Sequence, residues 1–166
     1  AEGSQKYIQI SNQKQTESDK IIIYEFFWYG CPHCYNLEPT MDRIEMNLDK
    51  DTILIQVPVA LRDTGEIHAK ASFALQPRSL DATLHEKIFT EIHINGNRLD
   101  TKEKLEEYIK DQGYNAKSFV EYFDSFGTDL RVKKGSRLAN QYQITSVPTL
   151  IINGKYKTSG SLVSSY

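Results

Sequence analysis

Cysteine is scarce in this chain of 166 residues, which contains only Cys31 and Cys34. Two cysteines are too few for the disulfide framework that holds small secreted domains together. A structural zinc site usually takes four ligands, and two thiols supply only half of them. The cysteine count, with the two residues three positions apart, therefore favours a redox pair.

Long apolar runs and a strong net charge are also missing. The formal net charge is −2, and no block of lysine or arginine stands out, so nothing favours binding to nucleic acid. The longest apolar candidates, Ile21–Tyr29 and Val147–Ile152, are too short to span a membrane. No leader peptide is visible, and the start at Ala1 suits a mature chain whose signal peptide has been removed. The composition is that of a globular domain that folds without disulfides or metal.

The first part of the chain predicts a strand, a helix and a second strand. The short run Tyr7–Ile10 predicts an edge strand, and the β-branched and aromatic run Ile21–Phe27 predicts a buried central strand. Pro32 suits the first turn of a helix, which the apolar spacing continues to Leu48. Ile53–Val59 predicts a second buried strand, and this order of elements is typical of a parallel pair.

Residues 62–142 predict a run of short helices. Apolar residues recur at helical spacing in Gly65–Leu75 and in Ser79–Ile92. Capping residues predict three more helices. The first follows Asp100 or Thr101 and ends at Gly113, and the second follows Asn115 and ends at Gly127. The third follows Thr128 and reaches Tyr142.

The end of the chain predicts a β-hairpin. Thr149–Ile152 predicts a strand, Asn153-Gly154 is the strongest short hairpin signal, and Lys155–Thr158 predicts the returning edge strand. Together with the parallel pair, the hairpin favours an α/β protein with a thioredoxin-like fold and an inserted helical domain. The predicted parts are residues 1–61 with 143–166 for the thioredoxin-like domain, and residues 62–142 for the insertion.

The segment Cys31-Pro32-His33-Cys34 joins the first buried strand to its helix. Residues i and i+3 share one face of a helix, so the two sulfurs can reach disulfide distance, with Cys31 exposed and Cys34 shielded. A thiolate at a helix N-terminus has a lowered pKa, and a nearby His33 lowers it further. Because a stable thiolate stabilises the reduced protein, the motif favours a disulfide donor that needs no cofactor beyond its own redox-active disulfide.

Val147-Pro148 and Glu25 are further candidates for the site. A cis peptide bond before Pro148 would turn the Val147 backbone toward Cys31 and offer hydrogen bonds to an extended peptide, but a trans proline at a strand start is also common. Glu25 lies inside an apolar strand. It either is buried and accepts a proton from Cys34, with a raised pKa, or lies on an exposed stretch of the strand. The residues alone leave both pairs of alternatives open.

Five other residues carry weaker signals. His68, His85 and His93 lie in predicted helices, and their spacing is not that of metal ligands. We interpret most of them as surface or capped residues, and we predict no metal site. Trp28 and Tyr29, next to the cysteines, are interpreted as core residues that could also line a peptide groove.

These segments together resemble the DsbA family of bacterial disulfide-forming oxidoreductases. The resemblance is carried by Glu25–Tyr35, Ile144–Leu150 and Asn153–Tyr156, and it covers nearly the whole chain. It implies that Cys31 is the nucleophile, Cys34 its partner, His33 a residue that tunes the thiolate, Pro148 a cis-proline preceded by Val147, and Glu25 a buried acid. It further implies a periplasmic protein that oxidises unfolded or partly folded exported proteins with free thiols and is reoxidised by a DsbB-type membrane protein.

Two features of the chain differ from the family. Some relatives carry a lysine on the strand beside the buried acid, whereas Thr52–Val59 contains none. The family also has a further helix after the last strand, whereas this sequence ends at Tyr166. These differences bear on how Glu25 handles a proton and on what covers one face of the sheet.

Three other functions stay open from the sequence. A disulfide isomerase or reductase on the same fold would need a persistent dithiol and usually a dimer, but residues 1–20 are too short for a dimerisation segment. A chaperone-like module would bind peptides beside Pro148 and leave the cysteines idle, which makes two cysteines at a helix start hard to explain. A metal carrier would use the two thiols as ligands.

Overall fold

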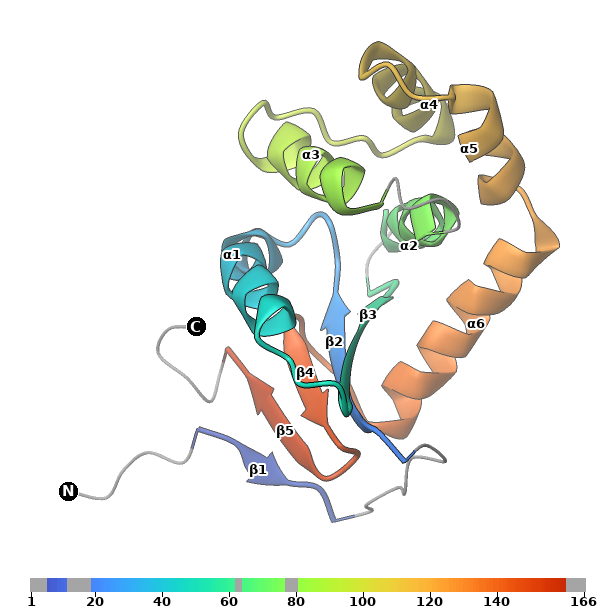
Figure 1. Ribbon diagram of the computed structural model, residues 1–166. Helices are drawn as coiled ribbons and strands as arrows, with labels where there is room; N and C mark the ends of the chain where they lie inside the picture. Colours follow the sequence, from blue (N-terminus) through green and yellow to red (C-terminus); the bar gives the residue numbers. More distant parts are fainter. Residues whose placement is uncertain (1–5, 12–18, 62–63, 77–80, 161–166) are drawn as a thin grey trace.

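The computed structural model describes residues 6–11, 19–61, 64–76 and 81–160 (Figure 1). Its described residues form one five-stranded sheet in the order β1-β5-β4-β2-β3. The strands are β1 (Ile8–Gln9), β2 (Ile21–Phe27), β3 (Thr52–Pro58), β4 (Thr149–Ile152) and β5 (Tyr156–Ser159). Only β2 and β3 run parallel, and the other neighbouring strands are antiparallel. This is the sheet of a thioredoxin-like fold, as predicted.

The helices cover the sheet and extend beyond one of its ends (Figure 1). They are α1 (Pro32–Met46), α2 (Gly65–Leu75), α3 (Asp81–His93), α4 (Lys102–Asp111), α5 (Ala116–Phe123) and α6 (Phe126–Gln141). Leu37 and Met41 of α1 pack with Leu150 of β4. A second cluster joins Ala139 of α6 to Phe26 and other core residues of the sheet. The predicted insertion, residues 62–142, thus contains a helix that completes the core of the sheet, and the division into two parts stays a prediction.

Several local predictions are confirmed. Thr101 and Asn115 cap α4 and α5 by accepting hydrogen bonds from the backbone three residues later. Asn153 and Gly154 take positive φ values of 53° and 62°, which is the conformation that a tight hairpin turn between β4 and β5 requires. Of the predicted helix 79–92, residues 79–80 lie outside the described residues, and α3 begins at Asp81.

The predicted boundary between the last two helices is wrong. The hydroxyl of Ser125, rather than that of Thr128, caps α6 by accepting a 3.2 Å hydrogen bond from the Thr128 amide. The Thr128 hydroxyl is buried and donates to the Tyr122 carbonyl at 2.7 Å, so it is not available as a cap. Gly127 lies inside the first turn of α6 and ends no helix, because α5 already stops at Phe123.

Candidate active site

The redox motif lies where β2 leads into α1. Cys31 occupies the N-cap position of α1, and its Sγ accepts a 3.4 Å hydrogen bond from the Cys34 amide. Pro32 takes the first helical position, where its missing N–H leaves no hydrogen bond unmade. Both cysteines are free thiols. Cys34 is shielded as predicted, at 0% exposure, but Cys31 is itself only 7% exposed, less than we predicted.

The two thiols differ strongly in acidity. The pKa of Cys31 falls to about 6, first because the Cys34 thiol can donate a hydrogen bond to its thiolate. The backbone amides of Cys34 and His33 and the charge of His33 act in the same direction, while burial opposes them. The pKa of Cys34 is raised, because its thiol donates to Cys31 and because it is buried. The predicted influence of His33 is present, but the larger influence of Cys34 was not foreseen.

The loop before β4 lies beside Cys31. The Val147–Pro148 peptide bond is cis, which is the alternative that the family resemblance implied. The Cys31 thiol donates a hydrogen bond to the Val147 carbonyl oxygen, with the two atoms 3.7 Å apart. Residues more than a hundred positions apart in the sequence therefore meet at one sulfur atom. This contact explains part of the burial of Cys31.

Glu25 is fully buried, which decides between the two alternatives left open by the sequence. It lies opposite Gln56 in the parallel register of β2 and β3, and the Gln56 Nε2 donates to its Oε2 at 2.8 Å. The pKa of Glu25 rises to about 7, first because of burial and then because of the nearby Glu38, while Gln56 and His85 lower it. The charge of Glu25 in turn raises the pKa of Cys34.

A hydrogen-bonded chain next to Glu25 was missed by the sequence reasoning. The Tyr29 hydroxyl lies 2.8 Å from His85 Nδ1, and His85 Nε2 lies 3.0 Å from Glu38 Oε2. Glu38 could have been found, because it follows Cys34 by four residues on the same face of α1. No local signal marks His85, which α3 brings to this place from 47 residues farther along the chain.

The other two predicted surface histidines also contact the segment before the cysteines. His68 is buried, and its Nδ1 accepts a 2.9 Å hydrogen bond from Trp28 Nε1. Burial lowers the pKa of His68. His93 Nε2 donates to the Tyr29 carbonyl at 2.7 Å. The interpretation of these histidines as surface residues was therefore wrong, because two helices of the insertion region, α2 and α3, fold back over Trp28 and Tyr29.

Two further features can be stated for the described part of the chain only. It contains no group of three or more histidine, cysteine, aspartate or glutamate side chains that could hold a metal ion. Within the same residues, every helix is too short or too polar to cross a bilayer.

The fold and the site together define a class of protein. A dithiol at a helix N-terminus, next to a cis-proline loop and on a thioredoxin-like sheet, is the arrangement of a thiol–disulfide oxidoreductase. Comparison with known proteins gives the family. The model of the DSBA-like thioredoxin domain matches residues 57–163. The chain belongs to this family and is a thiol:disulfide oxidoreductase, which confirms the resemblance found in the sequence.

Individual relatives extend the match to the cysteine motif. The thiol:disulfide interchange protein DsbA of Pseudomonas syringae pv. tomato is 31% identical over 157 residues, covering 94% of this chain and 73% of the relative. The protein of the same name from Azotobacter vinelandii is 34% identical over 138 residues, covering 83% and 64%. The crystal structure of Pseudomonas aeruginosa DsbA superimposes with a TM-score of 0.91 at 28% identity, covering 97% of this chain and 84% of that one.

Proposed function

We propose that this chain oxidises substrate proteins by donating a disulfide formed between Cys31 and Cys34. The observation that carries this direction is the unequal acidity of the pair, with the pKa of Cys31 lowered to about 6 and that of Cys34 raised. At neutral pH the reduced protein then holds a thiolate at Cys31 and a thiol at Cys34. A stabilised thiolate favours the reduced protein over its disulfide, and this makes the disulfide an oxidant.

The reaction proceeds in two exchanges. A substrate thiolate attacks the Cys31 sulfur, the disulfide breaks, and the electron pair leaves on Cys34, which takes a proton from Glu25. The second substrate thiolate then attacks the substrate sulfur of the mixed disulfide, and Cys31 leaves as a thiolate. The substrate dithiol has lost two electrons to the enzyme disulfide. In these steps Cys31 is the leaving group and the site of attack, and Glu25 is the acid.

The loop before β4 is the proposed binding place for the substrate backbone. The Val147 carbonyl lies beside the Cys31 sulfur, and Pro148 fixes the direction of that carbonyl. An extended peptide next to Val147 can form main-chain hydrogen bonds that do not depend on its sequence. This suits a protein that accepts many unfolded or partly folded substrates with free thiols.

The proposed location is the bacterial periplasm, with a DsbB-type membrane protein as the reoxidant. An oxidising pair in the cytosol would be held reduced by glutathione and could not act as a donor. The relatives named thiol:disulfide interchange protein DsbA support the same setting. The proposal uses no bound cofactor, because the redox-active disulfide itself carries the electrons.

The equilibrium between this protein and glutathione tests the direction of the reaction. The fraction of reduced Cys31 and Cys34 is read by thiol alkylation across a series of reduced to oxidised glutathione ratios. We expect a reduction potential far above the value of about −270 mV that thioredoxin shows. A potential near that of thioredoxin would overturn the proposal and assign the chain to the reductases on this fold.

A further inference from the structure

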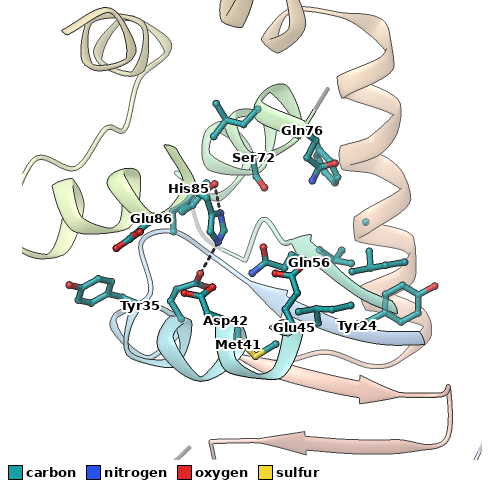
Figure 2. Close-up of a pocket in the computed structure, with 18 of the residues that line it drawn as sticks. Tyr24, Tyr35, Met41, Asp42, Glu45, Gln56, Ser72, Gln76, His85 and Glu86 are labelled. Atoms are coloured by element: carbon teal, nitrogen blue, oxygen red, sulfur yellow. Dashed lines mark hydrogen bonds and ion pairs between the residues drawn. The ribbon is translucent and has the colours of Figure 1, made fainter. Parts of the chain in front are cut away.

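A pocket of about 1720 Å³ lies between α1, the edge strand β3 and the helices α2, α3 and α6. Figure 2 shows His85 and Gln56 pointing into it, with Asp42 of α1 close by. Glu38 of α1 and Glu86 of α3 also line it. The end of the pocket between α1 and α3 is therefore polar, and it reaches the side chains that surround the buried acid.

His85 has a partner at each ring nitrogen. Nδ1 lies 2.8 Å from the Tyr29 hydroxyl, and Nε2 lies 3.0 Å from Glu38 Oε2, as the dashed lines in Figure 2 mark. The side chains of His85 and Glu38 are 14% and 12% exposed. An imidazole can take a proton at one nitrogen and release it from the same ring when a partner and water are within reach. His85 thus stands between the solvent of the pocket and an almost buried carboxylate.

Glu25 has no exposed surface, and the charges of Glu38 and His85 both act on its pKa. Gln56, which lines the pocket, donates a hydrogen bond to Glu25, and the Glu38 charge raises the pKa of Glu25. Among the described residues, Glu25 Oε1 and Glu38 Oε1 are the buried side-chain oxygen atoms without a hydrogen-bond partner. Buried polar atoms without partners are costly, so these two are suited to hold a proton.

Each catalytic cycle requires a proton to travel between Cys34 and the solvent. Reduction of the enzyme disulfide adds a proton at Cys34, and reoxidation removes it. Cys34 is fully buried, as is Glu25, so neither can exchange a proton with bulk water directly. Gln56, which is hydrogen-bonded to Glu25, and Glu38 and His85, whose charges act on the pKa of Glu25, all line the pocket.

We propose that Glu38 and His85 carry protons between Glu25 and the water of this pocket, with His85 acting on the reaction only through Glu38. The inference rests on the proposed role of Glu25 as the proton partner of Cys34. During reoxidation Glu25 takes the Cys34 proton and gives one to Glu38. Glu38 passes a proton to an unprotonated Nε2 of His85, and the ring releases its Nδ1 proton to pocket water by way of the Tyr29 hydroxyl, which also lines the pocket. Reduction runs the same path inward.

Other charged and titratable groups lie around this proton path. They are Cys34 and Tyr29, then Tyr35, Asp42 and Glu45 on α1, Tyr24 on β2, Glu86 on α3, and Arg131, Lys134 and Arg137 on α6. The residues of α2 that line the pocket are not titratable.

The test follows the reaction of the reduced protein with oxidised glutathione. The Cys31 thiolate forms a mixed disulfide and expels one glutathione thiolate. Cys34 then loses its proton, attacks the Cys31 sulfur and expels the second. Acid quenching and mass spectrometry separate the two steps. We expect His85→Ala to slow the second step about tenfold at pH 7, below the 10²–10⁴ range of a group that transfers the proton directly, and to leave the first step unchanged.

Chemical rescue separates proton transfer from structure. The space left by His85→Ala adjoins the pocket, so free imidazole can enter it and restore the second step. Pyrazole has the same size but is barely basic, and we expect no rescue from it. His93→Ala is the matched control, because His93 also lies on α3 and contacts Tyr29 but does not line the pocket. We expect no specific slowing of the second step in this control.

Each result has a distinct meaning. If His85→Ala leaves the second step unchanged, or if imidazole and pyrazole act alike, His85 has a structural role and the proton path is refuted. Glu25→Gln tests the underlying role separately. If Glu25→Gln fails to slow the second step, the proposed function of Glu25 fails as well; if it slows that step and His85→Ala does not, only the path through His85 is lost.

Discussion

Gln56 lies directly opposite Glu25 in the sheet and donates a 2.8 Å hydrogen bond to its carboxyl group. The donor is an uncharged amide, and the segment Thr52–Val59 contains no lysine. A hydrogen bond from an amide stabilises the ionised carboxyl less than a buried ammonium group would. Burial and then the Glu38 charge raise the pKa of Glu25 to about 7, and the Gln56 hydrogen bond offsets only part of this rise.

Two substitutions of Gln56 should therefore move the pKa of Glu25 in opposite directions. Gln56→Lys places a cation beside the carboxyl and should lower that pKa by about 1–3 units. Gln56→Met removes the donor while nearly keeping the volume, and should raise the pKa above 7. Carboxyl ¹³C NMR titration of the reduced protein measures both. Shifts in the same direction for both variants would show that Gln56 does not support the carboxylate.

The raised pKa of Glu25 should make the protein less stable as the pH rises. An ordinary glutamate releases its proton near pH 4.5, while the folded protein keeps the Glu25 proton to about pH 7. The folded state therefore binds more protons than the unfolded state in this window, and stability is lost from about pH 4.5 to 7. The full loss at pH 8 is about 3 kcal/mol, at about 1.4 kcal/mol for each pKa unit.

Urea unfolding of the wild type and of Glu25→Gln between pH 4 and 8 measures this loss. Glutamine cannot titrate, so the difference between the two curves isolates Glu25 and cancels the titration of Cys31, which both proteins share. We expect the variant to gain relative stability as the pH rises. Two curves that run parallel would mean that Glu25 ionises as easily in the folded as in the unfolded chain.

The thiol of Cys34 should influence the acidity of Cys31 more than His33 does. Cys34 is the first cause of the lowered pKa of Cys31, and the charge of the exposed His33 is a minor one. Loss of a hydrogen bond to a charged group costs about 1.5–3 kcal/mol, so Cys34→Ala should raise the pKa of Cys31 by about 1–2 units. His33→Gln should raise it less.

Thiolate absorbance near 240 nm, followed against pH, reports this pKa directly. Cys34→Ser is the matched control, because its hydroxyl can still donate to the Cys31 thiolate and should keep most of the lowered value. A larger effect from His33→Gln than from Cys34→Ala would reverse the assigned order of causes.

The sequence predicts the parts of the fold whose signals are local. The parallel pair β2 and β3 and the caps Thr101 and Asn115 depend on neighbouring residues, and the structure confirms them. The prediction fails at Thr128, where two hydroxyl groups compete for one helix start. Nothing in the local pattern says that the Thr128 hydroxyl is already bound to a carbonyl of the preceding helix.

The predictions for the candidate site divide in the same way, into local features that the sequence shows and distant contacts that it does not show. The cysteines and their helix are visible in the sequence because the motif and the strand before it adjoin. His68 and His85 are not visible as site residues in the sequence. His68 contacts Trp28 from 40 positions away, and His85 contacts Tyr29 from 56 positions away. Such contacts depend on how the helices of the insertion region fold back over the site, which periodicity does not show. The environment of Glu25 likewise depends on a distant contact, the hydrogen bond from Gln56, 31 positions away in the chain.

Gly30, just before Cys31, should tolerate no side chain. A Cβ atom there would clash with Cζ2 of Trp28, whose indole is held by the hydrogen bond to His68. Gly30→Ala must displace the ring and break that bond, and should destabilise the protein by about 1–3 kcal/mol, the usual cost of overpacking. Trp28 is the only tryptophan of the chain, so its fluorescence reports the displacement.

Gly127→Ala is the matched control, because it makes the same change in the first turn of α6, where a Cβ would meet only Ser125 Oγ at 3.9 Å. Alanine favours the helix over glycine, so this variant should gain up to about 1 kcal/mol and keep the emission spectrum. Urea unfolding gives both stabilities. If Gly30→Ala kept both the stability and the emission of the wild type, Trp28 would not be fixed against the active-site loop, and the packing described here would be wrong at that point.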